Sequence, residues 1–261
     1  MRKTKIGKHT VEFYDSIEDL PIARFQKFNK LLLIDSGVGS TVSDLDNHLH
    51  RMSKYVERGQ IDNFNKEVAN LRQNFFLIMT ELLPKHRAFA ALVTRVDDRE
   101  TTDISDSGLQ ETFELLSDVA EGEISNAVSE VKKKLDLECS SYFPRIFEDS
   151  VSKEYYSKLR DWTLATLEKI QSKKGEDCTE INKKIDTLAD ELLLFTDPKV
   201  FTGKDSVEIE LDKTFDSTCM LISQQLHVDP TSFTVLRFYN ALSYVQETLR
   251  REQKQLKRVR K

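Results

Sequence analysis

The chain has 261 residues, 39% of them hydrophobic and 32% charged, with a formal net charge of −5. Its 15 Phe and 7 Tyr leave enough apolar side chains for a core, which excludes a disordered chain, while only 8 Gly and 5 Pro favour long helices over a loop-rich β sandwich. No stretch approaches the length of an apolar membrane span, and the basic start lacks the apolar segment of a secretory signal.

The first predicted elements are a short strand or hairpin and a helix. Val11 and Phe13 alternate with polar residues, and Ile6-Gly7-Lys8 can turn the chain. From residue 22, apolar side chains recur every three or four positions as far as residue 33, which predicts a helix.

The stretch LLLIDSGVGST (31–41) allows two interpretations. A phosphate-binding loop of the Walker type needs Lys after its second glycine, but Gly39 is followed by Ser40. A dinucleotide fingerprint needs a third glycine where Val42 stands. We favour the end of one helix, with Gly37 just beyond it, and the start of the next at Ser40 or Thr41.

The next segment predicts an amphipathic helix. Thr41 and Asp44 can form a capping box, and Gly59 is a stop signal. The spacing 3-4-3-4 places five apolar residues on one face: Val42, Leu45, Leu49, Met52 and Val56. Further helices are predicted at 64–82, 86–96, 109–119, 123–137, 151–172, 179–195, 215–226 and 231–250, with a turn at 173–177.

Residues 199–211 contain a glycine turn followed by apolar alternation, which predicts a β-hairpin. The predicted fold class is therefore mainly α: a multi-helix bundle with a small β element from the N-terminus and residues 199–211. We expect these parts: an N-terminal strand or arm (1–14), a helical body (15–198), the β-hairpin (199–211), a C-terminal helical hairpin (212–249) and a basic tail (250–261).

The sequence offers no pattern of a catalytic or metal site. His48 and His50 lie two residues apart, so on a helix they point to different faces and are expected on a polar surface. The three cysteines (Cys139, Cys178 and Cys219) are far apart, which indicates a reducing compartment rather than a disulfide framework. There is no G-x-S-x-G elbow. We expect a protein that is not an enzyme, with no cofactor and no metal.

Residues 220–242 imitate a helix-turn-helix motif. The second helix offers only Arg237 as a base-reading cation, and Pro230 lengthens the link. An ordinary helical hairpin is therefore the preferred interpretation, and a DNA-binding regulator is the alternative.

Charge is concentrated at the two ends of the chain. Residues 249–261 hold seven cations and one acid, residues 1–8 hold four cations and no acid, and residues 9–248 therefore carry a net −15. The tail cations are the candidate contacts to a partner or to the DNA backbone: Arg250, Arg251, Lys254, Lys257, Arg258, Arg260 and Lys261. The alternative is a solvated helix end, where cations are favoured by the helix dipole.

Two segments carry a family resemblance. VEFYDSIEDLPIARFQKFNKLLLIDSGVGS and LRQNFFLIMTELLPKHRAFAALV resemble segments of virion proteins of crAss-like tailed phages of gut Bacteroidales. The stretch ISQQLHVDPTSFTVLRFYNALSYV is similar to phage tail and connector modules. The resemblance lies in the first third and at the end of the chain, and it rests on general pattern.

The resemblance implies a head-to-tail connector (adaptor) ring subunit of a short-tailed particle. Such rings typically hold twelve copies that dock beneath the portal around the DNA channel. The implied partners are further copies of the chain, portal and tail proteins and packaged DNA, with no membrane, in a virion assembled in the host cytoplasm. Alternatives are an ejected cargo protein, a tail chaperone, the DNA-binding regulator and an enzyme of an unrecognised helical fold.

Overall fold

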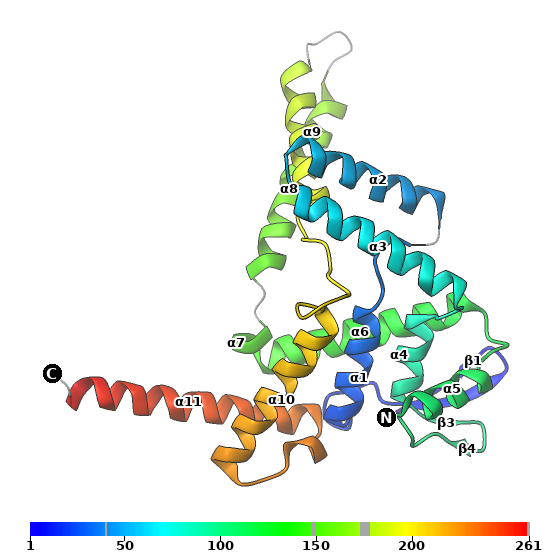
Figure 1. The fold of residues 1–261 in the computed structure, drawn as a ribbon, viewed down its shortest axis with the longest axis vertical. Helices are drawn as coiled ribbons and strands as arrows, with labels where there is room; N and C mark the ends of the chain where they lie inside the picture. The colour runs from blue at the N-terminus through cyan, green and yellow to red at the C-terminus, as the bar shows by residue number, and fades with distance from the viewer. Residues whose placement is uncertain (40, 148–149, 173–177, 260–261) are drawn as a thin grey trace. The chain divides into compact units, whose positions relative to one another are not determined.

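The computed structural model describes residues 1–39, 41–147, 150–172 and 178–259 (Figure 1). The chain forms two compact units that interleave along the sequence. Unit 1 consists of Met1–Asp35, Phe76–Phe147 and Phe201–Lys261, and unit 2 of Ser36–Phe75 and Glu148–Val200. The mainly α class with a small β element is confirmed. The predicted cap at Ser40, the turn at 173–177 and the last two tail cations lie outside the described residues.

The N-terminus of unit 1 forms the expected hairpin and is part of a four-stranded antiparallel sheet. The sheet order is β1-β2-β3-β4, with β1 (Arg2–Ile6), β2 (His9–Phe13), β3 (Val93–Val96) and β4 (Arg99–Glu100). Gly7 has φ +56°, a left-handed conformation that suits glycine in the turn between β1 and β2. Val11 and Phe13 are buried, as their alternation predicted.

The strand partners of this hairpin differ from the predicted ones. Residues 199–211 form no β-hairpin; from Val207 onward they are the start of α10 (Val207–Leu226). The acids Glu208 and Glu210, which produced the apparent alternation, lie in the first helical turn, where the dipole favours negative charge. The sheet instead recruits β3 from the segment 86–96, which was predicted to be helical throughout.

The remaining elements of unit 1 are helical and enclose one apolar core. Phe13 of the sheet meets Phe89 of α4 edge to face, with 5.2 Å between ring centroids. The helices are α1 (Ile22–Leu33), α4 (Pro84–Leu92), α5 (Asp106–Leu115), α6 (Glu121–Tyr142), α7 (Pro144–Phe147), α10, the 3₁₀ turn η1 (Pro230–Ser232) and α11 (Val235–Val259). Every residue of the continuous buried hydrophobic cluster belongs to this unit.

A buried arginine connects helix and sheet in unit 1. Arg24 of α1 is 8% exposed and donates hydrogen bonds to four carbonyl oxygens at 2.9–3.0 Å, those of Ala91, Val93, Thr101 and Thr102. Its guanidinium also lies 5.7 Å from the centre of the Tyr14 ring. Burial lowers the pKa of this group, but a guanidinium stays charged, so the carbonyl dipoles must stabilise the charge. Arg24 therefore fixes where the chain turns from α4 into β3.

We expect Arg24→Met to lower the free energy of unfolding of unit 1 by roughly 3 kcal/mol, because several carbonyls lose their donor. Arg24→Lys should be nearly as destabilising as Arg24→Met, since an ammonium has three donors and no planar fork. Chemical denaturation measures both, with exposed Arg99→Met as the control. An Arg24→Met variant as stable as the control would show that these hydrogen bonds contribute nothing net.

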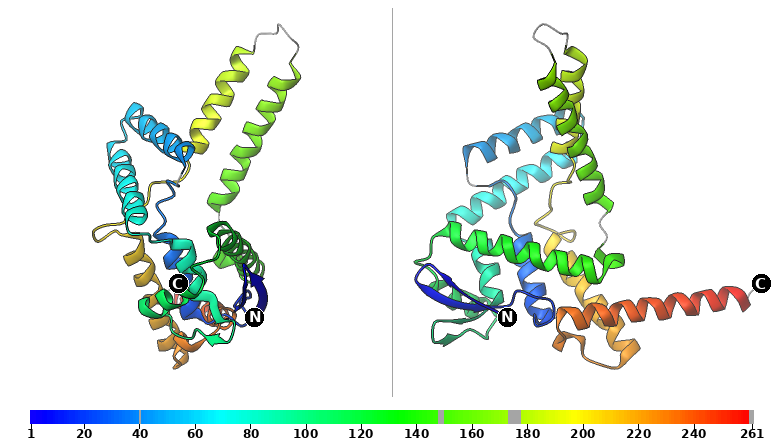
Figure 2. Two further views of the ribbon diagram at one scale, coloured as in Figure 1. Left: turned by 90° about the vertical axis from the view of Figure 1, so that its right-hand side faces the viewer. Right: turned by 180° about the vertical axis from the view of Figure 1, so that it is seen from behind.

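Unit 2 is built from helices of two chain segments that are far apart in the sequence. Its elements are α2 (Val42–Glu57), the part of α3 (Ile61–Met79) up to Phe75, α8 (Ser150–Gln171) and α9 (Thr179–Leu193). Figure 2 shows α8 and α9 as an antiparallel pair. The capping box of Thr41 and Asp44 and the stop at Gly59 (φ +67°) are confirmed.

The glycine stretch that follows α1 is a linker between two helices. Helix α1 continues through Leu33, so no strand precedes the glycines, as the helix interpretation predicted. Gly37 and Gly39 have φ values of +74° and +80°, which allow the chain to change direction before α2. The segment from residue 22 to residue 56 is thus two helices, one in each unit.

The face that α2 buries is polar, whereas an amphipathic helix is expected to bury its apolar face. His48, predicted on a polar surface, is 6% exposed, whereas Leu49 is 47% exposed. The cause is Glu67 of α3, whose side chain is completely buried. Arg51 Nη1 donates to Glu67 Oε1 at 3.1 Å, Asn70 Nδ2 donates to Oε2 at 3.1 Å, and His48 Nδ1 lies 3.3 Å from Oε2. A buried carboxylate requires such partners, so α2 turns its polar side toward it.

Arg51→Met should destabilise unit 2 by about 3 to 5 kcal/mol, because it leaves the buried Glu67 charge without its strongest compensation. Hydrogen exchange followed peptide by peptide should show lost protection in α2 and α3 and unchanged protection in α4. The matched change Arg58→Met, at an exposed helix end, should leave both unchanged. Equal effects of the two substitutions would contradict the role given to Arg51.

Candidate docking site at the C-terminal helix

The last helix has a buried first half and an exposed second half. Val235, Phe238 and Val245 of α11 are buried in unit 1. From Arg250 to Gln255 every side chain is exposed, and Figure 1 shows this end of the helix extending past α10. The helix is thus anchored by its apolar half, and its basic half is presented to solvent.

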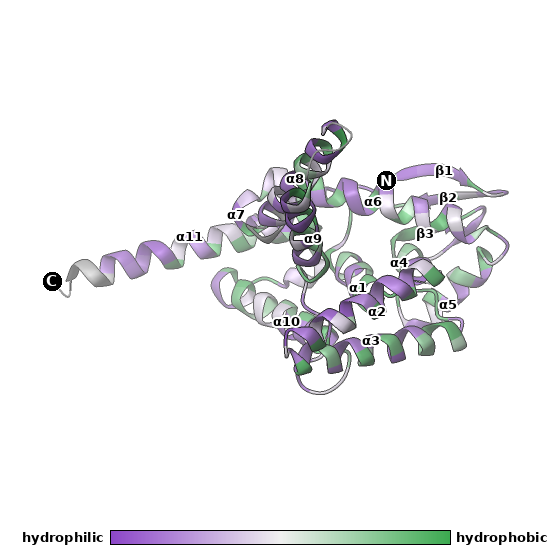
Figure 3. Ribbon diagram, turned by 90° about the horizontal axis from the view of Figure 1, so that it is seen from above, coloured by the Kyte–Doolittle hydropathy of each residue, from purple (hydrophilic) through white to green (hydrophobic). Residues whose placement is uncertain are grey.

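The structure places the predicted tail cations on this exposed half as far as they are described. Arg250, Arg251 and Lys254 lie on α11, whose outer part is mostly hydrophilic in Figure 3. Arg250 and Lys254 form no ion pair with a described residue, and Arg251 Nη2 lies 3.7 Å from Glu247 Oε2. Lys257 and Arg258 continue the helix, although their side chains are not described, and Arg260 and Lys261 lie outside the described residues.

One acidic residue separates these cations from the anchored half of the helix. Glu247 accepts a hydrogen bond from Arg145 of α7 at 3.3 Å and also faces Arg251. It therefore joins α7 to the base of the basic half, a contact that the sequence pattern did not indicate. The cations sit at the helix C-terminus, where the dipole favours them. Such an array can bind phosphates or carboxylates, but it lacks the aromatic side chains that would stack on bases.

The helix-turn-helix alternative finds little geometric support. His227 ends α10 in the left-handed conformation (φ +54°), which matches the position where such motifs favour glycine. However, the Arg237 guanidinium lies 4.1 Å from the centre of the Phe233 ring, and the first turn of α11 is packed into the core at Val235 and Phe238. The start of this helix is therefore not presented as a reading surface.

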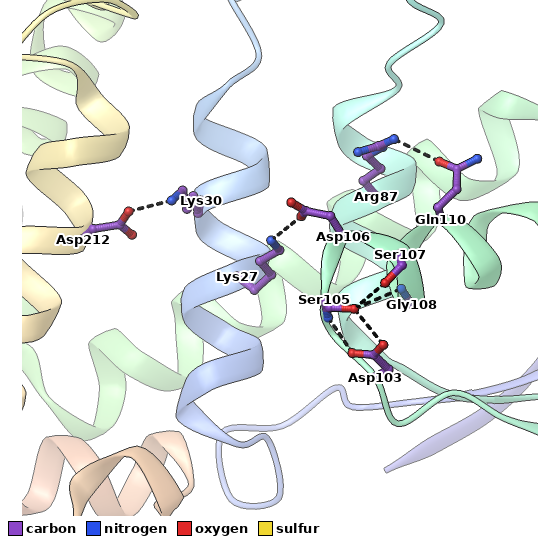
Figure 4. A network of polar contacts seen from close by, with 10 residues as sticks. All are labelled: Lys27, Lys30, Arg87, Asp103, Ser105, Asp106, Ser107, Gly108, Gln110 and Asp212. Carbon is purple, nitrogen blue, oxygen red and sulfur yellow. Dashed lines mark hydrogen bonds and ion pairs between the residues drawn. The ribbon is translucent and has the colours of Figure 1, made fainter.

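Two hollows are large enough for a ligand: a mostly apolar one of about 350 Å³ lined by residues of α8 and α9, and a more polar one of about 600 Å³ in unit 1. The larger is lined by residues 99–103 and by α5, and Figure 4 shows the contacts beside it. Asp103 accepts hydrogen bonds from the Ser105 backbone at 2.8 Å and its hydroxyl at 2.7 Å, so it shapes the start of α5. Lys27 of α1 binds Asp106 at 2.8 Å and Lys30 binds Asp212 of α10 at 2.6 Å. These polar groups hold helices together.

The described histidines and cysteines hold structural positions. Burial lowers the pKa of His86, and it raises the pKa of Cys139 to about 12 and that of Cys219 to about 11. These thiols therefore stay protonated and are poor nucleophiles. Among the described residues, no group of three or more His, Cys, Asp or Glu could hold a metal ion. Within the same residues, none of the helices has the length and apolar character needed to cross a membrane.

His9 bridges two carboxylates at the edge of the sheet. Its Nδ1 lies 2.7 Å from Asp97 Oδ2 and its Nε2 lies 2.9 Å from Asp118 Oδ1, while Lys8 also pairs with Asp118. Hydrogen bonds to Asp97 and Asp118 raise the pKa of His9. Hydrogen bonds from Lys8 and His9 lower the pKa of Asp118 to about 2. The cluster joins β2 to the β3–β4 turn and to the segment before α6.

No protein family, no curated protein and no solved structure matches the chain. The resemblance to phage virion proteins thus remains an expectation from the residues quoted above. The candidate docking site is therefore described by its own geometry alone.

The His9 cluster predicts a pH dependence of stability. Because the folded pKa of His9 is raised, its stabilisation is complete below the ordinary value of 6.5 and is lost as pH rises through the folded pKa. The two aspartates act oppositely, since their stabilisation is lost only as pH falls below 3.8. The Tm deficit of His9→Gln should therefore be larger at about pH 6 than at about pH 9. Exposed His50→Gln is the control, and a deficit independent of pH would be the contrary result.

Proposed function

We propose that this chain is a non-enzymatic structural subunit of a tailed-phage virion, a head-to-tail connector (adaptor) ring subunit that docks on the portal through the basic end of α11. The observation that carries the proposal is the construction of α11. Its first half is fixed in the core of unit 1, and its exposed second half presents Arg250, Arg251 and Lys254.

A rigid basic helix suits docking into an acidic groove. A helix anchored at one end loses less conformational entropy on binding than a free tail of the same composition. Its cations would attract a negatively charged partner over a Debye length and fix the orientation of the subunit. The acidic character of residues 9–248 would keep the rest of the molecule away from the same partner and from DNA.

The resemblance of the N-terminal third and of residues 222–245 to phage virion proteins supports the choice of assembly. Portal docking is preferred over direct contact with packaged DNA because the body is acidic and the basic half is short. A cargo protein or a tail chaperone would use similar helices but would not keep a fixed position in the mature particle. The mechanical role requires the chain to be present in purified virions of its phage, in a symmetric neck ring, and absence from the particle would reject it.

The triple variant Arg250→Gln/Arg251→Gln/Lys254→Gln should weaken binding to the portal protein of the same phage by at least about tenfold, and the residual binding should depend less on salt. The control carries the same charge change at exposed positions elsewhere in unit 1: Lys5→Gln, Arg99→Gln and Lys133→Gln. Fluorescence anisotropy with a labelled portal ring measures both, and a short DNA duplex is the second probe.

Loss of portal binding by the triple variant alone supports the proposal. Unchanged portal binding rejects docking through α11. Loss of duplex binding with portal binding intact also rejects it, and assigns the cations to DNA phosphates.

A further inference from the structure

The charges at the start of the exposed half of α11 follow one side of the helix. Glu247, Arg250, Arg251 and Lys254 are spaced three or four residues apart, so they share one face. The acid is the first member of this line and lies between the cations and the anchored half of the helix. A negative charge there opposes the binding of the carboxylates that the three cations attract.

A cation from another helix compensates this acid. Arg145 of α7 donates a hydrogen bond from Nη1 to Glu247 Oε1 at 3.3 Å, while Arg251 Nη2 lies 3.7 Å from Glu247 Oε2. The two guanidinium groups therefore share one carboxylate, and each uses its own oxygen. The contact to Arg251 is the longer of the two and exceeds hydrogen-bond distance, so Arg251 stays available to another acid.

Aromatic packing holds α7 against the anchored half of α11. The ring of Phe147 meets that of Tyr239 edge to face, with 4.8 Å between centroids, and the ring of Phe143 lies 5.6 Å from the same tyrosine. Arg145 stands between these two phenylalanines in the sequence. Its backbone is thus fixed to the helix that bears Glu247, while its side chain remains 76% exposed.

We propose that Arg145 is a positioning residue of the docking face, which acts by binding Glu247 and leaving Arg251 available to a partner carboxylate. Without Arg145, Glu247 would pair with Arg251 in the i, i+4 arrangement that is favourable within a helix, and a partner would have to displace it. Glu247 is an internal competitor for Arg251, and Arg145 limits that competition. The inference rests on the proposed function, because it takes the partner of α11 to be acidic.

A double-mutant cycle on Arg145 and Glu247 tests this coupling, because exposed ion pairs are individually weak. Arg145→Gln should raise the dissociation constant for a labelled portal ring of the same phage about two- to fivefold, since Glu247 then holds Arg251. Glu247→Gln removes the competitor and should bind at least as tightly as the unmodified chain. In that background, adding Arg145→Gln should have no further effect.

Fluorescence anisotropy compares the four proteins, and a labelled oligoglutamate peptide serves as a second probe that supplies carboxylates without the portal. Lys133→Gln on α6 and Glu111→Gln on α5 are the matched controls, since both positions are exposed and repeat the two charge changes elsewhere in unit 1. Neither control should alter binding. Circular dichroism should show the same helix content in all variants.

The cycle separates two roles for Arg145. An effect of Arg145→Gln that disappears in the Glu247→Gln background supports the inference. The same loss of binding in both backgrounds would overturn it, since Arg145 would then act as one more cation near the partner. Unchanged binding after Arg145→Gln alone would overturn it as well.

The two probes keep this inference apart from the proposed function. If oligoglutamate follows the cycle and the portal ring does not bind, the coupling stands and the connector proposal fails. If the portal ring binds through α11 and neither probe responds to Arg145→Gln, the connector proposal stands and the coupling fails. An unmodified chain that binds neither probe would contradict both.

Discussion

A single buried carboxylate sets the character of unit 2. Glu67 is removed from solvent on α3, and an uncompensated charge there would cost several kcal/mol. Its partners Arg51 and His48 come from α2, and they fix the rotation of that helix about its axis. For a given rotation about its axis, a helix can turn only one of its faces toward a buried group such as Glu67. With its polar side committed to Glu67, α2 presents its apolar side outward, and the surface of unit 2 is defined by that choice.

Unit 1 compensates its buried charge in a different way. Its buried charge, Arg24, is satisfied by backbone carbonyls from α4 to the segment after β4, so the charge reinforces a sheet that already has a continuous apolar core. The unit can therefore hold α11 firmly by its first half and support an exposed basic end. In the proposed connector, unit 1 provides the rigid docking helix, and this role depends on shape and charge.

Local signals in the sequence predicted much of the fold, because they depend on short-range physics. The Thr41–Asp44 capping box, the stop at Gly59 and the hairpin around Gly7 all lie where backbone hydrogen bonding and φ requirements place them. Periodicity also identified the five residues that share the α2 face. It could not tell whether that face points inward, because the answer depends on Glu67, which is distant in sequence. The buried position of His48 was missed for the same reason.

The other differences between the predicted and the observed elements arise from pairing between segments that are distant in the sequence. The alternation near residue 207 is compatible with strand or helix, and the acids in the first turn favour α10. The true partner strand, β3, is short and follows α4 directly, so its four residues carry too little pattern to stand apart from the helix. The tail cations of the candidate site were predicted from charge alone, whereas the link from Arg145 to Glu247 needs two segments far apart in the chain.

The outward orientation of α2 is the central claim, and hydroxyl-radical footprinting of the unmodified protein tests it most directly. Leu45 and Leu49, which are 37% and 47% exposed, should be readily oxidised, while Tyr55, intrinsically more reactive but 1% exposed, should be protected. Protected leucines and a freely oxidised Tyr55 would contradict the account.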